Sequence, residues 1–367
     1  MQYDKPMVTK EIIKQVPKVE LHDHLDGGLR IQTILSLAKA QGITLPTEDP
    51  EELHQWFVRG GKQKSLSLYL ESFALTTKVM QSSAALHRVA FEAVEDLAAE
   101  NVCYAEIRFA PILHTEGGLS LEEAVQAVLD GLQQGTRKTG MPTGLILCAM
   151  RNQSPSVSKS IAELAVAFAD RGVVGFDLAG DEIGYPAKKH LDAFQFIRSK
   201  NFNITIHAGE AFGVESIWQA VQLCGAHRIG HGVRLVEDMG IEGTRIEKMG
   251  SLAAFILDRR IPMEMCLTSN VGTGAVKDYD SHPFPILFRN KFRVFLCSDN
   301  RLMSDTTVTK EMELAVQYYN LTIRDLEKIT INAMKSAFIH HDQKLSIIYD
   351  VIKQQYADIR QKYNLQD

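Results

Sequence analysis

The stretch Lys18-Val-Glu-Leu-His-Asp-His-Leu25 contains the pattern from which the fold is predicted. It is an apolar-rich segment of strand length with polar side chains at its C-terminal end, and a longer region that contains helical periodicity follows it. Seven more segments of four to eight residues repeat this order, as is typical of parallel strands covered on both faces. The eight expected strands are 18–25, 102–109, 144–150, 173–178, 204–207, 228–231, 262–268 and 293–298.

Strands that alternate with helices indicate right-handed βαβ units and a parallel α/β sheet. Ser120-Leu-Glu-Glu123 is a capping box that should begin one of the intervening helices. Eight such units favour a closed (β/α)8 barrel, the TIM-barrel architecture. The alternative, an open doubly wound sheet, needs a glycine-rich phosphate loop after the first strand, and no such motif occurs. Gly27-Gly28 and Gly272-Thr-Gly274 are therefore interpreted as ordinary loop glycines.

The domain organisation follows from the spacing of these strands. No Pro/Gly/Ser-rich linker divides the chain, so we expect residues 1–367 to form a single barrel domain. The interval after the first strand, about 29–100, is too long for one crossover and should contain several helices that could cover the barrel mouth. Helical periodicity returns beyond Ser304, which predicts a helical tail over about 304–367.

Composition excludes several classes of function. A net charge of -5 offers no general attraction to nucleic acid or anionic membranes. No apolar run approaches the ~20 residues of a membrane helix, and residues 1–10 lack the apolar stretch of a secretory signal. The five cysteines show no C-x-x-C spacing, which argues against disulfide frameworks and cysteine-zinc sites. We therefore expect a cytoplasmic protein with buried thiols, and the sequence leaves its oligomeric state open.

Polar residues at the strand ends predict where chemistry occurs, because the C-terminal strand ends of a barrel converge on one face. His22 and His24 are the most informative pair, since residues i and i+2 of a strand point to the same side. Two imidazoles on one face are difficult to satisfy without a shared cation, and neutral imidazole is a common metal ligand. The full set of polar residues at strand ends is His22, His24, Asn152, Asp177, His207, Glu210, His231, Asn270 and Asp299.

Within this set, His207 supplies a third nitrogen and Asp299 a carboxylate oxygen. Three nitrogens and one oxygen suit Zn²⁺, and ligand type alone leaves Fe²⁺, Co²⁺ and Mn²⁺ open. Glu210 could be a general acid beside the metal, or simply a carboxylate favoured at a helix N-terminus. His231 could be a fourth ligand, or a base that orients the attacking water.

The other histidines lack this context. His227 is interpreted as a surface-loop residue, because the glycines that follow it argue against a helical H-x-x-x-H zinc motif. No G-x-S-x-G elbow and no P-C-x-x-C segment occurs, which argues against a serine hydrolase of that type and a cytidine-type zinc deaminase. Seven histidines are expected to be surface or structural residues: His54, His87, His114, His190, His282, His340 and His341.

Taken together, the motifs resemble the adenosine deaminase family of the amidohydrolase group, in its bacterial form. Six blocks occur in the family's order and span Pro17 to about Met303. They are Pro17-Lys-Val-Glu-Leu-His-Asp-His-Leu-Asp-Gly27, Asp177-Leu-Ala-Gly-Asp-Glu182, Thr205-Ile-His-Ala-Gly-Glu210, Arg228-Ile-Gly-His-Gly232, Pro262-Met-Glu-Met-Cys-Leu-Thr-Ser-Asn270 and Ser298-Asp-Asn300.

The resemblance implies a purine-salvage enzyme that converts adenosine and 2′-deoxyadenosine to inosine and 2′-deoxyinosine with release of ammonia. Water activated by one zinc ion per chain would attack purine C6 while Glu210 protonates N1 and His231 orients the attacking oxygen. By position, the metal ligands would be His22, His24, His207 and Asp299, and the residues contacting the nucleoside would be His24, Asp26, Gly180 and Asn300.

Two of these positions bear on specificity. Asp26 would accept a hydrogen bond from the ribose 5′-hydroxyl, whereas relatives that act on free adenine carry glutamate at this point. Asn300 replaces the second aspartate of the animal enzymes, a difference that should affect the strength and pH dependence of purine binding while catalysis survives. The alternatives are a deaminase of a modified or 5′-extended adenine nucleoside such as aminodeoxyfutalosine, and a non-catalytic purine-binding relative. In each case the expected partner is a small purine molecule.

Overall fold

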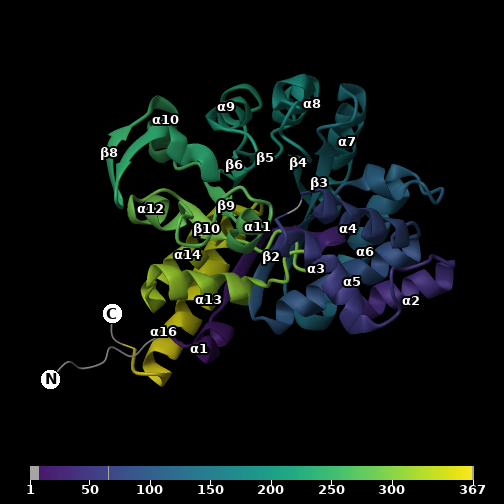
Figure 1. Ribbon diagram of the computed structural model, residues 1–367, viewed down its shortest axis with the longest axis horizontal. Helices are drawn as coiled ribbons and strands as arrows, with labels where there is room; N and C mark the ends of the chain where they lie inside the picture. The colour runs from purple at the N-terminus through teal and green to yellow at the C-terminus, as the bar shows by residue number, and fades with distance from the viewer. Residues whose placement is uncertain (1–7, 65, 366–367) are drawn as a thin grey trace.

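Two four-stranded parallel sheets form the centre of the computed structural model, which describes residues 8–64 and 66–365 (Figure 1). The first sheet has the order β1-β2-β3-β4 and the second has the order β10-β9-β6-β5. The strands are β1 (Lys18–His24), β2 (Val102–Phe109), β3 (Thr143–Met150), β4 (Val173–Ala179), β5 (Thr205–Ala208), β6 (Arg228–His231), β9 (Met263–Met265) and β10 (Val294–Leu296).

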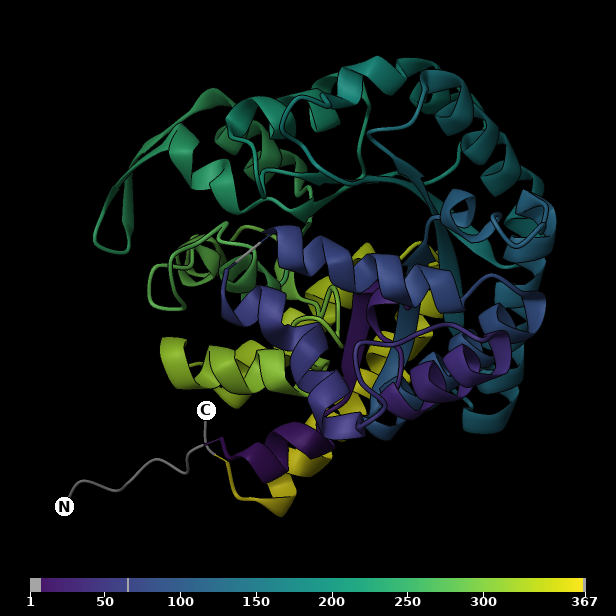
Figure 2. The ribbon, with the colours of Figure 1, turned by 45° about the vertical axis from the view of Figure 1, so that its right-hand side comes forward.

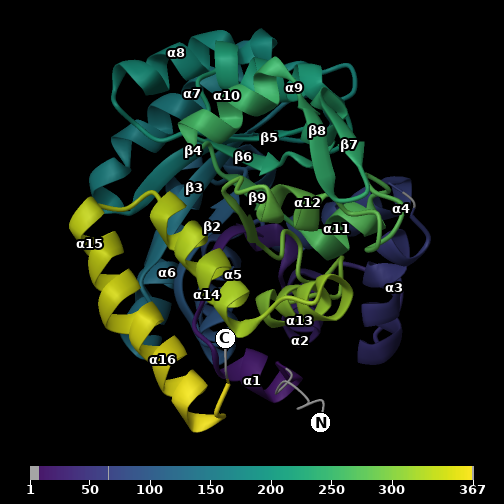
Figure 3. The same cartoon turned by 90° about the vertical axis from the view of Figure 1, so that its left-hand side faces the viewer.

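Single backbone bridges join the two sheets at both of their free edges. Asp23 of β1 pairs with Asp299, which follows β10, and Phe176 of β4 pairs with Ile204, which precedes β5. Each of the eight strands therefore has a neighbour on both sides, and helices surround them (Figure 3). This arrangement confirms the predicted (β/α)8 barrel, and the open doubly wound alternative is wrong.

Four helices fill the interval between the first two strands, in the region predicted to be helical (Figure 2). Tyr69 and Phe73 of the third of these helices line a cavity at the barrel mouth, so this insertion does cover part of the mouth. The helices are α2 (Ile31–Gln41), α3 (Pro50–Lys62), α4 (Leu66–Val79) and α5 (Ser83–Ala99).

The helices after β2 mostly cover the outside of the ring. The predicted capping box is present: the Ser120 hydroxyl accepts from the Glu123 amide, and the Glu123 carboxylate accepts from the Ser120 amide. The main helices are α6 (Leu121–Thr139), α7 (Pro155–Ala167), α8 (Leu191–Ser199), α9 (Val214–Trp218), α10 (Ser251–Arg259) and α12 (Phe284–Arg289).

The tail is helical as expected, and it brings the two ends of the described chain together. Gln15, at the end of α1 (Lys10–Gln15), donates a hydrogen bond of 2.6 Å to the Tyr363 hydroxyl. The tail helices are α13 (Val308–Tyr319), α14 (Ile323–Ser336), α15 (His341–Ser346) and α16 (Lys353–Lys362). Within the described ranges, no helix has the length and apolar character needed to cross a membrane.

Three features differ from the sequence prediction. The strand expected over 293–298 spans only Val294–Leu296. The strand expected over 262–268 spans only Met263–Met265, and α11 (Leu267–Gly272) begins directly after it, so Asn270 lies on a helix. Because Cys266 and Leu267 remain fully buried through the turn, the apolar run does not mark where the strand ends. The antiparallel hairpin β7 (Met239–Glu242) and β8 (Arg245–Met249) was not predicted; it projects from the barrel and is largely polar and exposed (Figure 2).

Candidate metal centre and catalytic pocket

Three imidazoles and one carboxylate meet at the C-terminal end of the barrel. The Nε2 atom of His207 lies 3.1 Å from Nε2 of His22 and 3.0 Å from Nε2 of His24. Oδ1 of Asp299 lies 3.2 Å from the His22 nitrogen and 3.5 Å from that of His24. All four ligand atoms lie within 4.8 Å of one another, so the structure contains a candidate metal site at the four predicted positions.

The hydrogen-bond partners of these rings fit a cation at their centre. Nδ1 of His22 lies 2.7 Å from a Glu264 oxygen, and Nδ1 of His207 lies 3.0 Å from Asp177. If each Nδ1 carries the proton of a neutral ring, each Nε2 presents a lone pair toward the other. Lone pairs at this distance repel unless a cation lies between them, and a tetrahedral zinc with bonds of about 2.0–2.1 Å would hold such nitrogens about 3.3 Å apart.

The other two ligands, His24 and Asp299, are in the ionisation state that a metal needs. Burial lowers the pKa of His24 well below its usual value, so this imidazole is neutral. Burial would raise the pKa of Asp299, but hydrogen bonding to His22 and the electrostatic interactions with the neighbouring histidine side chains outweigh it and hold that pKa well below its usual range. The other Asp299 oxygen accepts 2.6 Å from the Ser269 hydroxyl, which leaves Oδ1 facing the imidazoles.

Backbone geometry places Asp299 opposite the first strand. Its amide donates to the carbonyl of His22 at 2.7 Å, and its carbonyl accepts from the amide of His24 at 2.8 Å. Asp299 adopts φ = 64°, and His231 adopts φ = 65° at the end of β6. Both residues occupy the left-handed region, which non-glycine residues seldom adopt.

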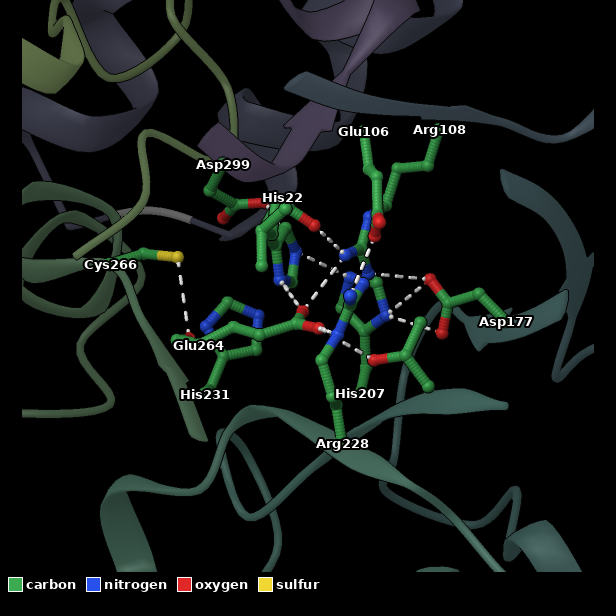
Figure 4. Close-up of polar contacts among 12 residues, drawn as sticks. His22, Glu106, Arg108, Asp177, His207, Arg228, His231, Glu264, Cys266 and Asp299 are labelled. Carbon is green, nitrogen blue, oxygen red and sulfur yellow. Dashed lines mark hydrogen bonds and ion pairs between the residues drawn. The ribbon is translucent and has the colours of Figure 1, made fainter. Parts of the chain in front are cut away.

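Behind the imidazoles lies a fully buried network of charges (Figure 4). The carboxylate of Glu264 accepts from Nδ1 of His22, from Arg108 at 2.8 Å and from Arg228 at 2.6 Å. Asp177 accepts from the same Arg108 at 2.9 Å in addition to its contact with His207. Burial would raise the pKa of both carboxylates. The two arginines nevertheless hold the pKa of Glu264 below its usual range, and His207 and Arg108 do the same for the pKa of Asp177. Both therefore remain ionised and orient the rings.

Glu210 lies beside this cluster on the turn that follows β5. The carboxylate of Glu182 accepts from the amides of Gly209, Glu210 and Phe212, at 3.1, 2.9 and 3.2 Å. The turn is therefore fixed, and the Glu210 side chain receives a hydrogen bond of 3.0 Å from the Thr273 hydroxyl. It is partly exposed to the pocket, within reach of a bound molecule.

His231 is held by a chain of hydrogen bonds from outside the pocket. The Phe284 amide donates to Nδ1 of His282, whose Nε2 contacts the Asn270 carbonyl oxygen at 3.2 Å. The Asn270 amide nitrogen then lies 3.1 Å from Nδ1 of His231. In this order each group donates to the next, so neutral His231 carries its proton on Nε2, which lies 3.4 Å from Glu210. Burial lowers the pKa of His282 to about 3, so this histidine stays neutral.

A cavity of about 430 Å³ opens in front of the cluster, within the usual size range of small-molecule sites. Among its lining residues, Asp26 is buried and its Oδ1 atom has no hydrogen-bond partner, and the same is true of Oδ1 of Asn300. Gly180 lines the cavity in a left-handed conformation, φ = 98°. Five carboxylate residues line this cavity but only one guanidinium, that of Arg234.

The structure thus brings the metal-binding, catalytic and nucleoside-contacting residues that the family resemblance implies to one cavity or its wall. They are His22, His24, Asp26, Gly180, His207, Glu210, His231, Asp299 and Asn300. His227 is exposed in the loop before β6, as expected, but His282 is buried and belongs to the chain that holds His231. Gly27 is also more than a loop glycine, because a side chain there would collide with Asn300. Sequence reasoning did not predict the network of Glu106, Arg108, Arg228 and Glu264. The signal that could have revealed it is the presence of charged residues inside apolar strand segments, since such residues are seldom buried unless they are paired.

Comparisons with known proteins agree with this geometry. Residues 17–354 match the model of a family described as adenosine deaminase. An adenosine deaminase of Mycobacterium sp. (strain JLS) is 52% identical over 356 residues, which cover 95% of this chain and 98% of that protein.

Solved structures show the same architecture. An adenine deaminase from Arthrobacter aurescens superposes with a TM-score of 0.82 at 25% identity, over 94% of this chain and 98% of that one. Arabidopsis ADAL complexed with IMP gives 0.81 at 27% identity, over 95% and 99%. An amidohydrolase from Burkhoderia ambifaria with bound Zn shares the fold, with a TM-score of 0.86 at 23% identity over 97% and 95%. By its sequence over nearly its whole length, this chain belongs to the adenosine deaminase family.

Proposed function

We propose that this chain hydrolyses adenosine and 2′-deoxyadenosine to inosine and 2′-deoxyinosine with release of ammonia. One observation carries the proposal: the Glu210 carboxyl group and a candidate cation site of four residues lie together at one cavity of about 430 Å³. Family membership and the names of the relatives support the same reaction. We propose further that residues 1–367 act as one barrel domain, and that the free thiols, four of them buried, suit a reducing cytoplasm.

His22, His24, His207 and Asp299 would hold the metal, and three imidazoles with one carboxylate are a ligand set that zinc accepts. When bound, zinc would act as a Lewis acid that makes water nucleophilic at neutral pH. Glu264 and Asp177 would keep two of the imidazoles in the ligand tautomer through their Nδ1 protons.

Glu210 would supply the proton that the purine ring needs. Protonation at N1 withdraws electrons from C6, where the oxygen of water adds and from which the amino group departs as ammonia. The Thr273 hydroxyl would position the Glu210 carboxyl, and His231, with its proton on Nε2, would donate toward the oxygen that adds to C6.

The charge of the cavity favours a neutral nucleoside over a nucleotide. With five carboxylate residues and one guanidinium in the lining, a 5′-phosphate would meet net repulsion. The unpartnered Oδ1 atom of Asp26 is instead suited to accept a hydrogen bond from a ribose hydroxyl. Gly180 and the Asn300 amide would contact the purine, and His24 and Asp26 would contact the nucleoside from the same cavity lining.

A panel of substrates tests this proposal. We expect the metal-loaded protein to deaminate adenosine and 2′-deoxyadenosine at least 100-fold more efficiently, in kcat/KM, than adenine, AMP or a 5′-extended nucleoside. Asp26→Ala should raise the KM for adenosine about tenfold, since one hydrogen bond to a charged group contributes about 1.5 kcal/mol, and should leave adenine turnover unchanged. Preferential turnover of a 5′-extended nucleoside, or binding of adenosine without turnover, would contradict the proposal.

A further inference from the structure

A second cavity lies at the opposite end of the barrel from the metal cluster. It has a volume of about 610 Å³ and is formed where four strands begin. Asn203 and Arg228 border it at β5 and β6, and Pro262 and Arg293 directly precede β9 and β10. The segment from Lys335 to Lys344, which joins α14 to α15, closes its side. We call this cavity the basal pocket.

The lining of the basal pocket is strongly basic. It contains no aspartate or glutamate, and its six lysine and arginine residues are Arg228, Arg259, Arg260, Arg293, Lys335 and Lys344. Glu106 and Glu264 neutralise Arg228 from behind the pocket wall. No ion pair is present for the other five among the described residues, so the pocket has a large uncompensated positive charge.

Two guanidinium groups at the pocket wall keep free donors. Arg228 is 1% exposed; its Nε and Nη1 atoms bond Glu264, Glu106 and the Ser336 carbonyl, but Nη2 has no partner. The Nε atom of Arg293 is buried and likewise has no partner. Buried donors of this kind cost free energy unless a bound acceptor satisfies them.

The cations also repel one another. Burial, reinforced by the charges of Arg228 and Arg293, lowers the pKa of Lys344 despite the opposing effect of Glu106. Burial and the charge of Arg260 lower the pKa of Arg293. A bound anion would relieve this repulsion, and arginine forks are suited to phosphate oxygens.

We propose that the basal pocket binds a phosphorylated small molecule that carries more than one anionic group. The five uncompensated cations exceed what a single phosphate needs, and the volume admits a larger molecule. A concave pocket on a chain with a net charge of -5 favours a small ligand over the extended backbone of a nucleic acid. This site is separate from the purine cavity, and the inference does not depend on the proposed reaction.

Calorimetric titration of the metal-loaded protein at low ionic strength tests the inference, with fructose 1,6-bisphosphate and inorganic phosphate as probes. Neither probe contains a purine, so saturating adenosine or its product should not displace them. We expect the bisphosphate to bind at least tenfold more tightly than phosphate. Arg293→Gln combined with Lys344→Gln should weaken bisphosphate binding at least tenfold without changing adenosine turnover.

Two further variants keep the test independent of folding defects. Arg259→Gln with Lys335→Gln alters only exposed side chains at the pocket mouth and should also weaken binding, by about threefold or more. Lys39→Gln with Arg137→Gln removes the same charge from distant exposed positions and should change affinity less than twofold. Equal affinity in the pocket and control variants, equal affinity for phosphate and bisphosphate, or absence of binding would overturn the proposal.

Discussion

The two ends of the barrel differ in charge although the same strands form both. The C-terminal end presents imidazoles and carboxylates around the 430 Å³ cavity, whereas the N-terminal end presents lysines and arginines around the basal pocket of 610 Å³. Between them lies the buried network in which Glu264 bonds His22 of one end and Arg228 of the other. The comparison shows that the two ends of one short strand, such as Arg228 and His231 of β6, can serve opposite chemistries when buried ion pairs separate them.

The largest expected effect comes from removing a metal ligand at the acidic end. His22→Ala should reduce bound zinc to below a tenth of an ion per chain and lower kcat to background, because the cluster loses one of four ligands. Elemental analysis and a deamination assay measure both quantities. His54→Ala is the control, since His54 pairs with Asp305 outside the cluster and should keep metal and activity. Full metal content in His22→Ala would contradict the assignment.

Glu210→Gln should separate chemistry from metal binding at the same end. The amide cannot deliver a proton to N1, so kcat should fall by about 10²–10⁴-fold while the zinc content stays unchanged. Glu237→Gln removes a nearby exposed carboxylate that pairs with Arg234 and should retain activity. A Glu210→Gln protein with more than a tenth of normal kcat would require another proton donor.

The third prediction concerns Glu264, which connects the two ends of the barrel through its hydrogen bonds. Glu264→Gln replaces the shared acceptor of His22, Arg108 and Arg228 with a neutral amide, which leaves buried arginine charge uncompensated. We expect a loss of about 3–5 kcal/mol in the free energy of unfolding and about 10–100-fold weaker zinc binding. Urea denaturation and metal competition measure these effects. Glu247→Gln on the exposed hairpin is the control, and equal stability of the two variants would show that the network contributes little.

The smallest effect is expected at a buried carboxylate without a cation partner. Burial raises the pKa of Glu311, on α13, from 4.5 to about 7, although hydrogen bonds from Thr268 and Thr306 oppose the shift. Protonation therefore stabilises the fold fully below pH 4.5, and this contribution is lost as the pH rises through 7.

Relative to wild type, Glu311→Gln should accordingly gain up to about 3 kcal/mol in the free energy of unfolding between pH 4.5 and pH 9. Denaturation at a series of pH values measures the difference. Glu313→Gln on the same helix, where Glu313 pairs with exposed Lys10, should show little pH dependence relative to wild type. A pH-independent difference for Glu311→Gln would place its pKa near the normal value.

The barrel was predictable because each strand carries its signal locally. Parallel strands covered on both faces must be apolar over most of their length, and β1, β2 and β6 lie within a residue of the predicted limits. The limits of β9 were not predictable, because the first residues of α11 are as buried as the strand. The β7–β8 hairpin lacks an apolar run because it projects into solvent.

The candidate site was only partly predictable. Its predicted metal ligands lie at the C-terminal ends of strands, which converge on one face of a barrel. The i, i+2 spacing of His22 and His24 predicted that these two side chains lie on the same side of their strand. The roles of Glu264 and His282 depend on contacts across the barrel and along a relay through Asn270, which no local pattern encodes. The charge of the basal pocket was likewise not predictable, because its cations come from several separate segments between Arg228 and Lys344.

The left-handed backbone at His231 and Asp299 has a consequence for how this protein could be evolved or engineered. Glycine and asparagine tolerate that conformation best, and each strained position costs on the order of 1–3 kcal/mol. Selection for heat resistance alone would therefore favour replacing the imidazole and the carboxylate that the chemistry needs most. If variants are selected for thermostability without an activity screen, substitutions at these two positions should appear first. They should stabilise the barrel and abolish its activity.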